Sequence, residues 1–79
     1  MQRFVWERYN MLNELDSVIL KMPLPEGSVP LGAHGVVLMV YHEPTIGYEV
    51  EFFDSSERSL GSFTTDEKHL EKRAGSRRL

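Results

Sequence analysis

The chain has 79 residues, a formal net charge of −3 and no cysteine. This length allows one domain, which buries only about 60–65% of the surface of its unfolded chain, and the lack of cysteine excludes disulfides and thiolate metal sites as ways to stabilise it. No apolar stretch approaches the roughly 20 residues of a membrane-spanning helix, and charged residues stand where the apolar part of a signal peptide would lie, so we expect a cytoplasmic protein.

The first element is expected at the N-terminus. Apolar residues recur at helical spacing over residues 1 to 14, which predicts a helical extension. This helix could pack on its own domain or against a neighbouring chain. We expect a β-barrel domain over residues 15 to 73, and a mobile basic tail over residues 74 to 79.

The barrel domain begins with two predicted strands separated by a long loop. Residues 16 to 21 form the first strand, and residues 22 to 30 contain three prolines that exclude a regular ladder. Residues 35 to 41 form the second strand, because they are a short apolar run that contains β-branched side chains. It follows a tight turn at Gly32 and Gly35, since either glycine can adopt a positive φ.

Two more strands, a helical turn and a last short strand complete the domain. Residues 48 to 53 form the third strand, in which Tyr48, Val50 and Phe52 should face the core while Glu49 and Glu51 face water.

The fourth strand is expected over residues 59 to 64. The sequence Thr64-Thr65-Asp66-Glu67 matches a capping box and predicts a short helical turn. Residues 69 to 72 form either a brief fifth strand or the end of that turn. Short strands joined by polar turns favour a closed small barrel, because closure removes the exposed edges of a sheet.

Four stretches carry a resemblance to a known family: residues 12 to 18 (LNELDSV), 24 to 26 (LPE), 32 to 37 (GAHGVV) and 48 to 52 (YEVEF). In this order they resemble DUF4926, a family of small bacterial domains of unknown function with an SH3-like barrel. The GAHGVV stretch is also similar to the KOW motif of ribosomal and transcription-factor barrels. The resemblance implies a five-stranded SH3-like fold, but it implies no reaction and no site residues.

The second strand is apolar on both faces, so one face fills the barrel and the other needs a cover. Each large apolar side chain left in water forgoes roughly 1.5–3 kcal/mol of burial energy, and Val37, Met39, Tyr41 and Phe53, or the complementary set, would form this outer face. The N-terminal helix or a second copy could cover it. We predict a homo-oligomer with an interface that contains Phe4, Val5, Trp6, Tyr9, Val37, Met39, Tyr41 and Phe53.

Charge is distributed unevenly along the chain. Residues 11 to 67 contain ten acidic residues and two basic ones, a net charge of −8, whereas residues 68 to 79 contain one acidic and five basic ones, a net charge of +4. An acidic body repels phosphate and favours a basic protein partner. We therefore predict an acidic docking face at Glu49, Glu51 and Asp54.

The titratable residues show no pattern that indicates catalysis. No pair among His34, His42 and His69 has the spacing of metal ligands on one helix. Glu49 and Glu51 should lie about 7 Å apart on an outward strand face rather than in a pocket. We predict no enzymatic activity, catalytic residue, cofactor or metal.

The function that these features favour is a non-catalytic protein-interaction or assembly module that associates with itself. One alternative is a KOW-like RNA-binding domain, although residues 11 to 67 offer only Lys21 and Arg58 for phosphate. The other alternative is an antitoxin or immunity-type protein that masks a basic partner. Binding to nucleic acid or to a membrane is not expected.

Overall fold

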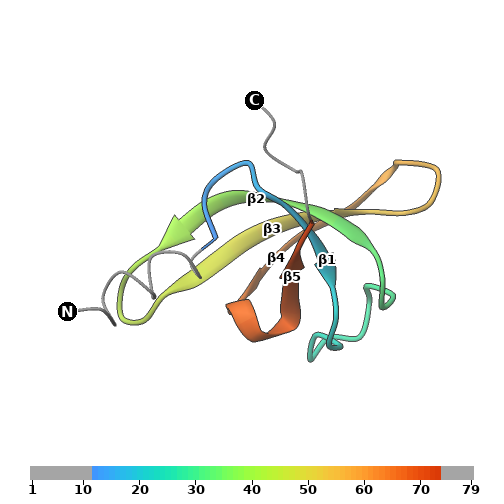
Figure 1. Ribbon diagram of the computed structural model, residues 1–79. Helices are drawn as coiled ribbons and strands as arrows, with labels where there is room; N and C mark the ends of the chain where they lie inside the picture. Colours follow the sequence, from blue (N-terminus) through green and yellow to red (C-terminus); the bar gives the residue numbers. More distant parts are fainter. Residues whose placement is uncertain (1–11, 74–79) are drawn as a thin grey trace.

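A computed structural model describes residues 12–73, which form five β-strands and one short 3-10 helix (Figure 1). In chain order the elements are β1 (Ser17–Leu20), β2 (His34–Tyr41), β3 (Gly47–Phe53), β4 (Ser59–Thr65), η1 (Glu67–His69) and β5 (Leu70–Lys72). Each strand lies within one residue of its predicted boundaries. The prediction of a mainly β protein is therefore confirmed.

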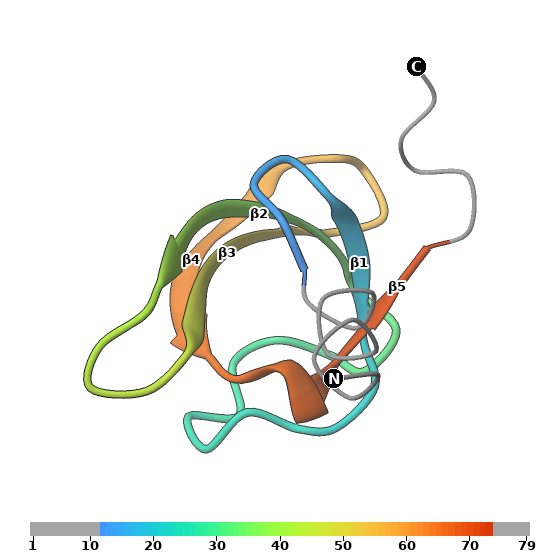
Figure 2. The ribbon, with the colours of Figure 1, turned by 60° about the vertical axis from the view of Figure 1, so that its left-hand side comes forward.

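The five strands form one antiparallel sheet in the order β4-β3-β2-β1-β5. Strands β4 and β5 follow each other in the sequence but lie at opposite edges, and the turn that contains η1 joins them. Figure 2 shows that the sheet is strongly curved. No pairing between β4 and β5 is present in residues 12–73, so the structure establishes a curved open sheet and not the predicted closed barrel.

Two predictions about the ends of the chain fall wholly or partly outside the described residues. A helix is predicted over residues 1 to 14, of which residues 1 to 11 lie outside the described part. Residues 12 to 14 form a loop and the start of a turn, not a helix. The predicted tail over residues 74 to 79 also lies outside the described part.

The predicted capping box is wrong, although a short helical turn does form. Thr64 and Thr65 still belong to β4, where Thr65 pairs with Tyr48, so their backbone is extended. Asp66 takes the N-cap position, and its side chain makes no capping hydrogen bond. The pairing of β4 with β3 thus determines where η1 begins.

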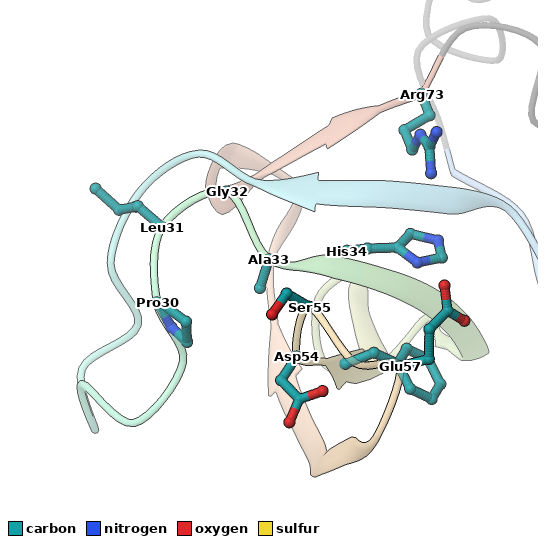
Figure 3. Close-up of a pocket in the computed structure, with 10 residues that line it drawn as sticks. Pro30, Leu31, Gly32, Ala33, His34, Asp54, Ser55, Glu57 and Arg73 are labelled. Atoms are coloured by element: carbon teal, nitrogen blue, oxygen red, sulfur yellow. The ribbon is translucent and has the colours of Figure 1, made fainter.

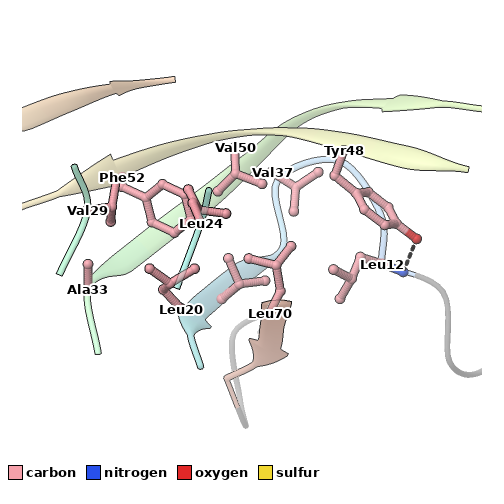
Figure 4. Close-up of a cluster of buried hydrophobic side chains, with 11 residues drawn as sticks. Leu12, Leu20, Leu24, Val29, Ala33, Val37, Tyr48, Val50, Phe52 and Leu70 are labelled. Atoms are coloured by element: carbon pink, nitrogen blue, oxygen red, sulfur yellow. Dashed lines mark hydrogen bonds between the residues drawn. The ribbon is translucent and has the colours of Figure 1, made fainter. Parts of the chain in front are cut away.

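The core lies on the concave face of the sheet (Figure 4). Tyr48, Val50 and Phe52 are fully buried, which confirms the predicted alternation of β3. The proline-rich loop contributes Leu24 and Val29, which are 3% and 4% exposed, and so covers part of the core. The buried apolar cluster consists of Leu12, Val18, Leu20, Leu24, Val29, Ala33, Val37, Tyr48, Val50, Phe52 and Leu70.

The two glycines before and in β2 have different roles. Gly32 has a φ of +88°, which is the left-handed region that favours glycine. Gly35 is not in this region. It is buried in β2, and a Cβ at this position would lie 2.8 Å from both Phe52 Cδ1 and Val50 Cγ1. The predicted positive φ therefore holds for Gly32 alone, and Gly35 is required by the space that Phe52 and Val50 occupy.

The buried hydroxyl of Tyr48 connects the core to the segment before β1. Its oxygen accepts a hydrogen bond from the backbone N–H of Leu12 at 3.3 Å. Burial raises the pKa of the Tyr48 hydroxyl above its ordinary value of 10.0, and the nearby carboxylates of Glu67 and Asp16 act in the same direction. The hydroxyl is therefore neutral, and it fixes the start of the domain against β3.

A buried carboxylate holds the start of β1 against β5. Asp16 is 1% exposed, and its Oδ2 accepts a hydrogen bond from the backbone N–H of Asn13 at 2.8 Å. The same oxygen lies 3.5 Å from Lys72 Nζ, whose side chain is 46% exposed. One residue further along both strands, the Arg73 N–H donates to the Ser17 carbonyl at 3.0 Å. These contacts hold the edge strand β5 against β1.

Candidate functional site

The convex face of the sheet combines apolar and acidic side chains. Strand alternation places Met39 opposite Glu49 and Val36 opposite Glu51 on this face. His34 faces Phe53 at one end of the same two strands, with ring centroids 6.0 Å apart. All of these pairs lie on the side of the sheet away from the core.

A β-bulge in β2 changes which residues face outward. The pairing of β2 with β3 shifts between Val37 and Met39, so Leu38 is the extra residue. Val37, before the bulge, is fully buried opposite Val50, whereas Leu38 and Met39 are 43% and 46% exposed. Val37 therefore belongs to the core and not to the predicted outer face. Neither alternating set of β2 residues forms that face as a whole, because the bulge interrupts the alternation.

We define the bulge patch as Leu38, Met39 and Tyr41, all exposed near one end of β2. Leu15 lies beside it, because its backbone N–H donates to the Val37 carbonyl at 2.7 Å. The Leu15 side chain is 75% exposed, and its φ of 72° is unusual for a residue other than glycine. Four exposed apolar residues thus surround one irregular point of the sheet.

The predicted interface residues are divided by the structure. Met39, Tyr41 and Phe53 lie on the convex face, with Met39 and Tyr41 exposed and Phe53 half-buried at the opposite end of the strands. Val37 is buried in the core. The remaining predicted members lie outside the described residues; they are Phe4, Val5, Trp6 and Tyr9.

The predicted acidic docking face is also divided. Glu49 and Glu51 share the convex face of β3, and Glu49 Oε1 accepts hydrogen bonds from Thr64 Oγ1 at 2.7 Å and from the Tyr41 hydroxyl at 3.4 Å. Asp54 lies beyond the strand in the β3–β4 turn. These hydrogen bonds orient the Glu49 carboxylate at the border of the bulge patch.

Asp54 organises the turn rather than presenting a free carboxylate. Its Oδ1 accepts hydrogen bonds from the backbone N–H groups of Ser56 and Arg58 at 2.8 and 2.9 Å, and its Oδ2 lies 3.8 Å from Arg58 Nε. The turn holds Glu57 at a φ of 68°. This left-handed position of a hairpin turn is usually occupied by glycine.

A cleft of about 500 Å³ opens near the end of the sheet opposite the bulge patch (Figure 3). Three segments that are distant in sequence line it: the turn before β2, the β3–β4 turn and the end of β5. Sequence reasoning missed this cleft. The only local signal was the turn at Gly32, because the β3–β4 turn reaches the cleft through the pairing of β2 with β3, and the end of β5 reaches it through the pairing of β1 with β2 and with β5. Its lining residues are Pro30, Leu31, Gly32, Ala33, His34, Phe53, Asp54, Ser55, Glu57 and Arg73.

The three histidines lie in separate places. His34 is in β2, and its Nε2 is shielded from solvent without a hydrogen-bond partner. His42 follows β2, and His69 is in η1, where its Nδ1 lies 3.4 Å from the Met22 carbonyl oxygen. Among residues 12–73, no three metal-ligating side chains gather at one point.

Comparison with known families agrees with the predicted resemblance. The family described as "Domain of unknown function (DUF4926)" matches residues 14–72, which is most of the chain. The chain belongs to this family. The DUF4926 match contains all five strands, the bulge patch and every cleft residue except Arg73. No match was found among curated proteins or among solved structures. The described part of this DUF4926 protein contains no helix with the length and apolar character needed to cross a membrane.

Proposed function

We propose that this protein is a non-catalytic interaction module that associates with itself through the bulge patch. The observation that carries the proposal is the exposure of consecutive apolar residues, Leu38 and Met39, at a bulge that turns both away from the core. Bulges are typical features of sites where a strand must direct particular side chains. Leu15 and Tyr41 extend the apolar surface on either side.

Covering this surface contributes favourable free energy to association. Full burial of a large apolar side chain contributes about 1.5–3 kcal/mol, so covering the exposed half of Leu38 or Met39 contributes about 1 kcal/mol each. Leu15 is more exposed and contributes more. A second copy of the same patch would supply matching apolar area.

Charge supports a second part of the proposal, a basic protein partner. Residues 12–73 carry eleven acidic and five basic residues, a net charge of −6. Such a field attracts cationic partners and increases their rate of encounter. An antitoxin or immunity-type role belongs to this class of function.

We also infer that the curved sheet is an SH3-like barrel. Three features support this inference: five antiparallel strands, short connections after β2 and β3, and a 3-10 turn between the last two strands. The family resemblance in the sequence points to the same fold.

The oligomeric state tests the proposal. We expect the protein to sediment as a dimer or larger assembly at micromolar concentration, and Met39→Lys to make it a monomer. Lysine is preferred to glutamate because Met39 lies opposite Glu49, where a second acidic side chain would destabilise the sheet itself.

Two further variants make the test specific. Met22→Lys is the matched control, because Met22 is 42% exposed, close to the 46% of Met39, but lies in the loop after β1. It should leave the assembly unchanged, while Leu38→Lys should also disrupt it. A wild-type protein that is monomeric at all concentrations would contradict the proposal, and so would assemblies that persist in folded Met39→Lys and Leu38→Lys proteins.

A further inference from the structure

The cleft near the end of the sheet has two chemically different sides. In Figure 3, Arg73, His34 and Glu57 lie along one side, and Pro30 and Leu31 lie along the other. Leu31 is 59% exposed, although it is a large apolar residue. The volume of about 500 Å³ lies within the range of 300–1,000 Å³ that is usual for ligand sites.

Two charged side chains of the cleft are available to a ligand. Glu57 and Arg73 form no ion pair with any residue of 12–73, whereas Asp54 is engaged by Ser56 and Arg58. Glu57 also has a left-handed backbone, which costs a non-glycine residue about 1 kcal/mol or more. Glycine would avoid this cost.

The sign of the surrounding charge determines which ligands are favoured. The net charge of −6 over residues 12–73 disfavours phosphates and other polyanions near Glu57. A cation close to Glu57 is favoured, and Arg73 can donate hydrogen bonds to a neutral carbonyl oxygen. The exposed apolar side of the cleft can pack against an aliphatic side chain.

We propose that this cleft binds an extended peptide segment of a partner protein, in which a lysine or arginine is adjacent to an aliphatic residue. Glu57 receives the cationic side chain, Arg73 donates to a backbone carbonyl of the peptide, and Pro30 contacts the aliphatic side chain. This inference specifies the basic partner of the proposed function. The cleft is a separate surface from the bulge patch, because His34 and Met39 are about 16 Å apart along β2.

The test is an NMR titration of the isotope-labelled full chain with three blocked tripeptides: acetyl-Leu-Arg-Leu-amide, acetyl-Leu-Gln-Leu-amide and acetyl-Leu-Glu-Leu-amide. We expect amide shifts concentrated at Gly32, Ala33 and Ser55, and about three- to fivefold tighter binding of the arginine peptide than of the glutamine peptide, as for one exposed ion pair. Glu57→Gln should remove this difference. Glu26→Gln, which neutralises an exposed carboxylate in another loop, should leave it unchanged.

Salt and the patch variants separate this inference from self-association. Higher salt should weaken the binding of the arginine peptide to the cleft, but should strengthen association between two negatively charged copies of the protein. Met39→Lys should abolish assembly without changing peptide affinity. If assembly fails but the arginine peptide still binds at the cleft, the self-association proposal alone is wrong.

Four results would overturn the inference. The first is an absence of cleft shifts with any peptide, and the second is equal binding of the glutamate and arginine peptides by the wild-type protein. The third is cleft shifts in Arg77→Ala/Arg78→Ala without added peptide, which would assign the cleft to the chain's own basic residues. The fourth is tighter binding of a short RNA than of the arginine peptide at the same amides.

Discussion

Replacing Gly35 by alanine should destabilise the protein by about 2–3 kcal/mol, near the upper end of the usual cost of overpacking a core. The added Cβ would lie 2.8 Å from Phe52 Cδ1 and from Val50 Cγ1, whereas carbon atoms in contact prefer 3.5–4.0 Å. Both neighbours are fully buried, so relieving the overlap requires a shift of about 0.7 Å or more on two sides at once. A chain of this length has about 4–12 kcal/mol of stability in total.

Gly32→Ala is the matched control, because the same methyl group is added three residues earlier. No atom lies within 4 Å of a Cβ at this position, but the φ of +88° is unfavourable for alanine. The strain of about 1–2 kcal/mol is partly offset by the lower entropy of the unfolded chain, so we expect a net loss of about 0.5–1 kcal/mol. The loss comes from overlap with buried atoms at Gly35 and from backbone strain at Gly32. Removing an overlapping atom should therefore compensate for Gly35→Ala but not for Gly32→Ala.

Urea unfolding followed by far-UV circular dichroism measures both changes. Each kcal/mol corresponds to about 4–8 °C in the midpoint of thermal unfolding for a domain of this size. Val50→Ala removes one of the two overlapping atoms, so it should cost less in the Gly35→Ala background than in the wild type. The reasoning would be refuted if Gly35→Ala lost no more stability than Gly32→Ala, or if the effects of Gly35→Ala and Val50→Ala were additive.

Three other substitutions test contacts at the start of the domain. Asp16→Ala should lose about 2 kcal/mol in urea unfolding, since the Asn13 N–H loses a charged acceptor; a loss below about 0.5 kcal/mol, the size of an ordinary surface effect, would contradict this. Leu15→Gly should gain about 0.5–1 kcal/mol, because it relieves a φ of 72° on a side chain that is 75% exposed, and a lower melting midpoint would count against that strain. Tyr48→Phe should lose about 1 kcal/mol at pH 7, because the Leu12 N–H loses its acceptor. In the wild type, burial raises the folded-state pKa of Tyr48, so the unfolded state loses this proton first; stability is complete below pH 10.0 and falls as the pH rises toward the folded-state pKa. Tyr48→Phe should flatten this decline, and an unchanged slope would show that another group causes it.

The strands could be predicted because their signals are local. In β3 the alternation of Tyr48, Val50 and Phe52 with two glutamates fixes both the element and its buried face, and the structure confirms it. In β2 the apolar run has no alternation, so nothing in it marks Leu38 as the bulged residue. The wrong placement of Val37 follows from that missing signal.

The ion pair at Asp16 and the cleft could not be predicted for a different reason. Nothing in the sequence distinguishes Asp16 from an ordinary strand or turn residue. Only the approach of Lys72 from β5 makes it a buried, paired carboxylate. Glu57 and Arg73 likewise reach one cleft through the successive pairings of β3 with β2, β2 with β1 and β1 with β5. Such sites are defined by contacts between distant segments, which a pattern in one segment does not encode.

The hydrogen bond between the Arg73 N–H and the Ser17 carbonyl places the first and last strands of the domain next to each other. A linker of a few residues could therefore connect Arg73 to Asn13, with new chain ends opened in the connection between β2 and β3. In such a circular permutant β5 and β1 become neighbours in the sequence, and their pairing closes a short loop instead of nearly the whole chain. The same cut leaves β2 and β3 at opposite ends of the permuted chain, and their pairing is longer than that of β1 with β5. Since the entropy of loop closure slows the pairing of distant strands, the permuted chain should fold more slowly than the natural order while retaining the same sheet.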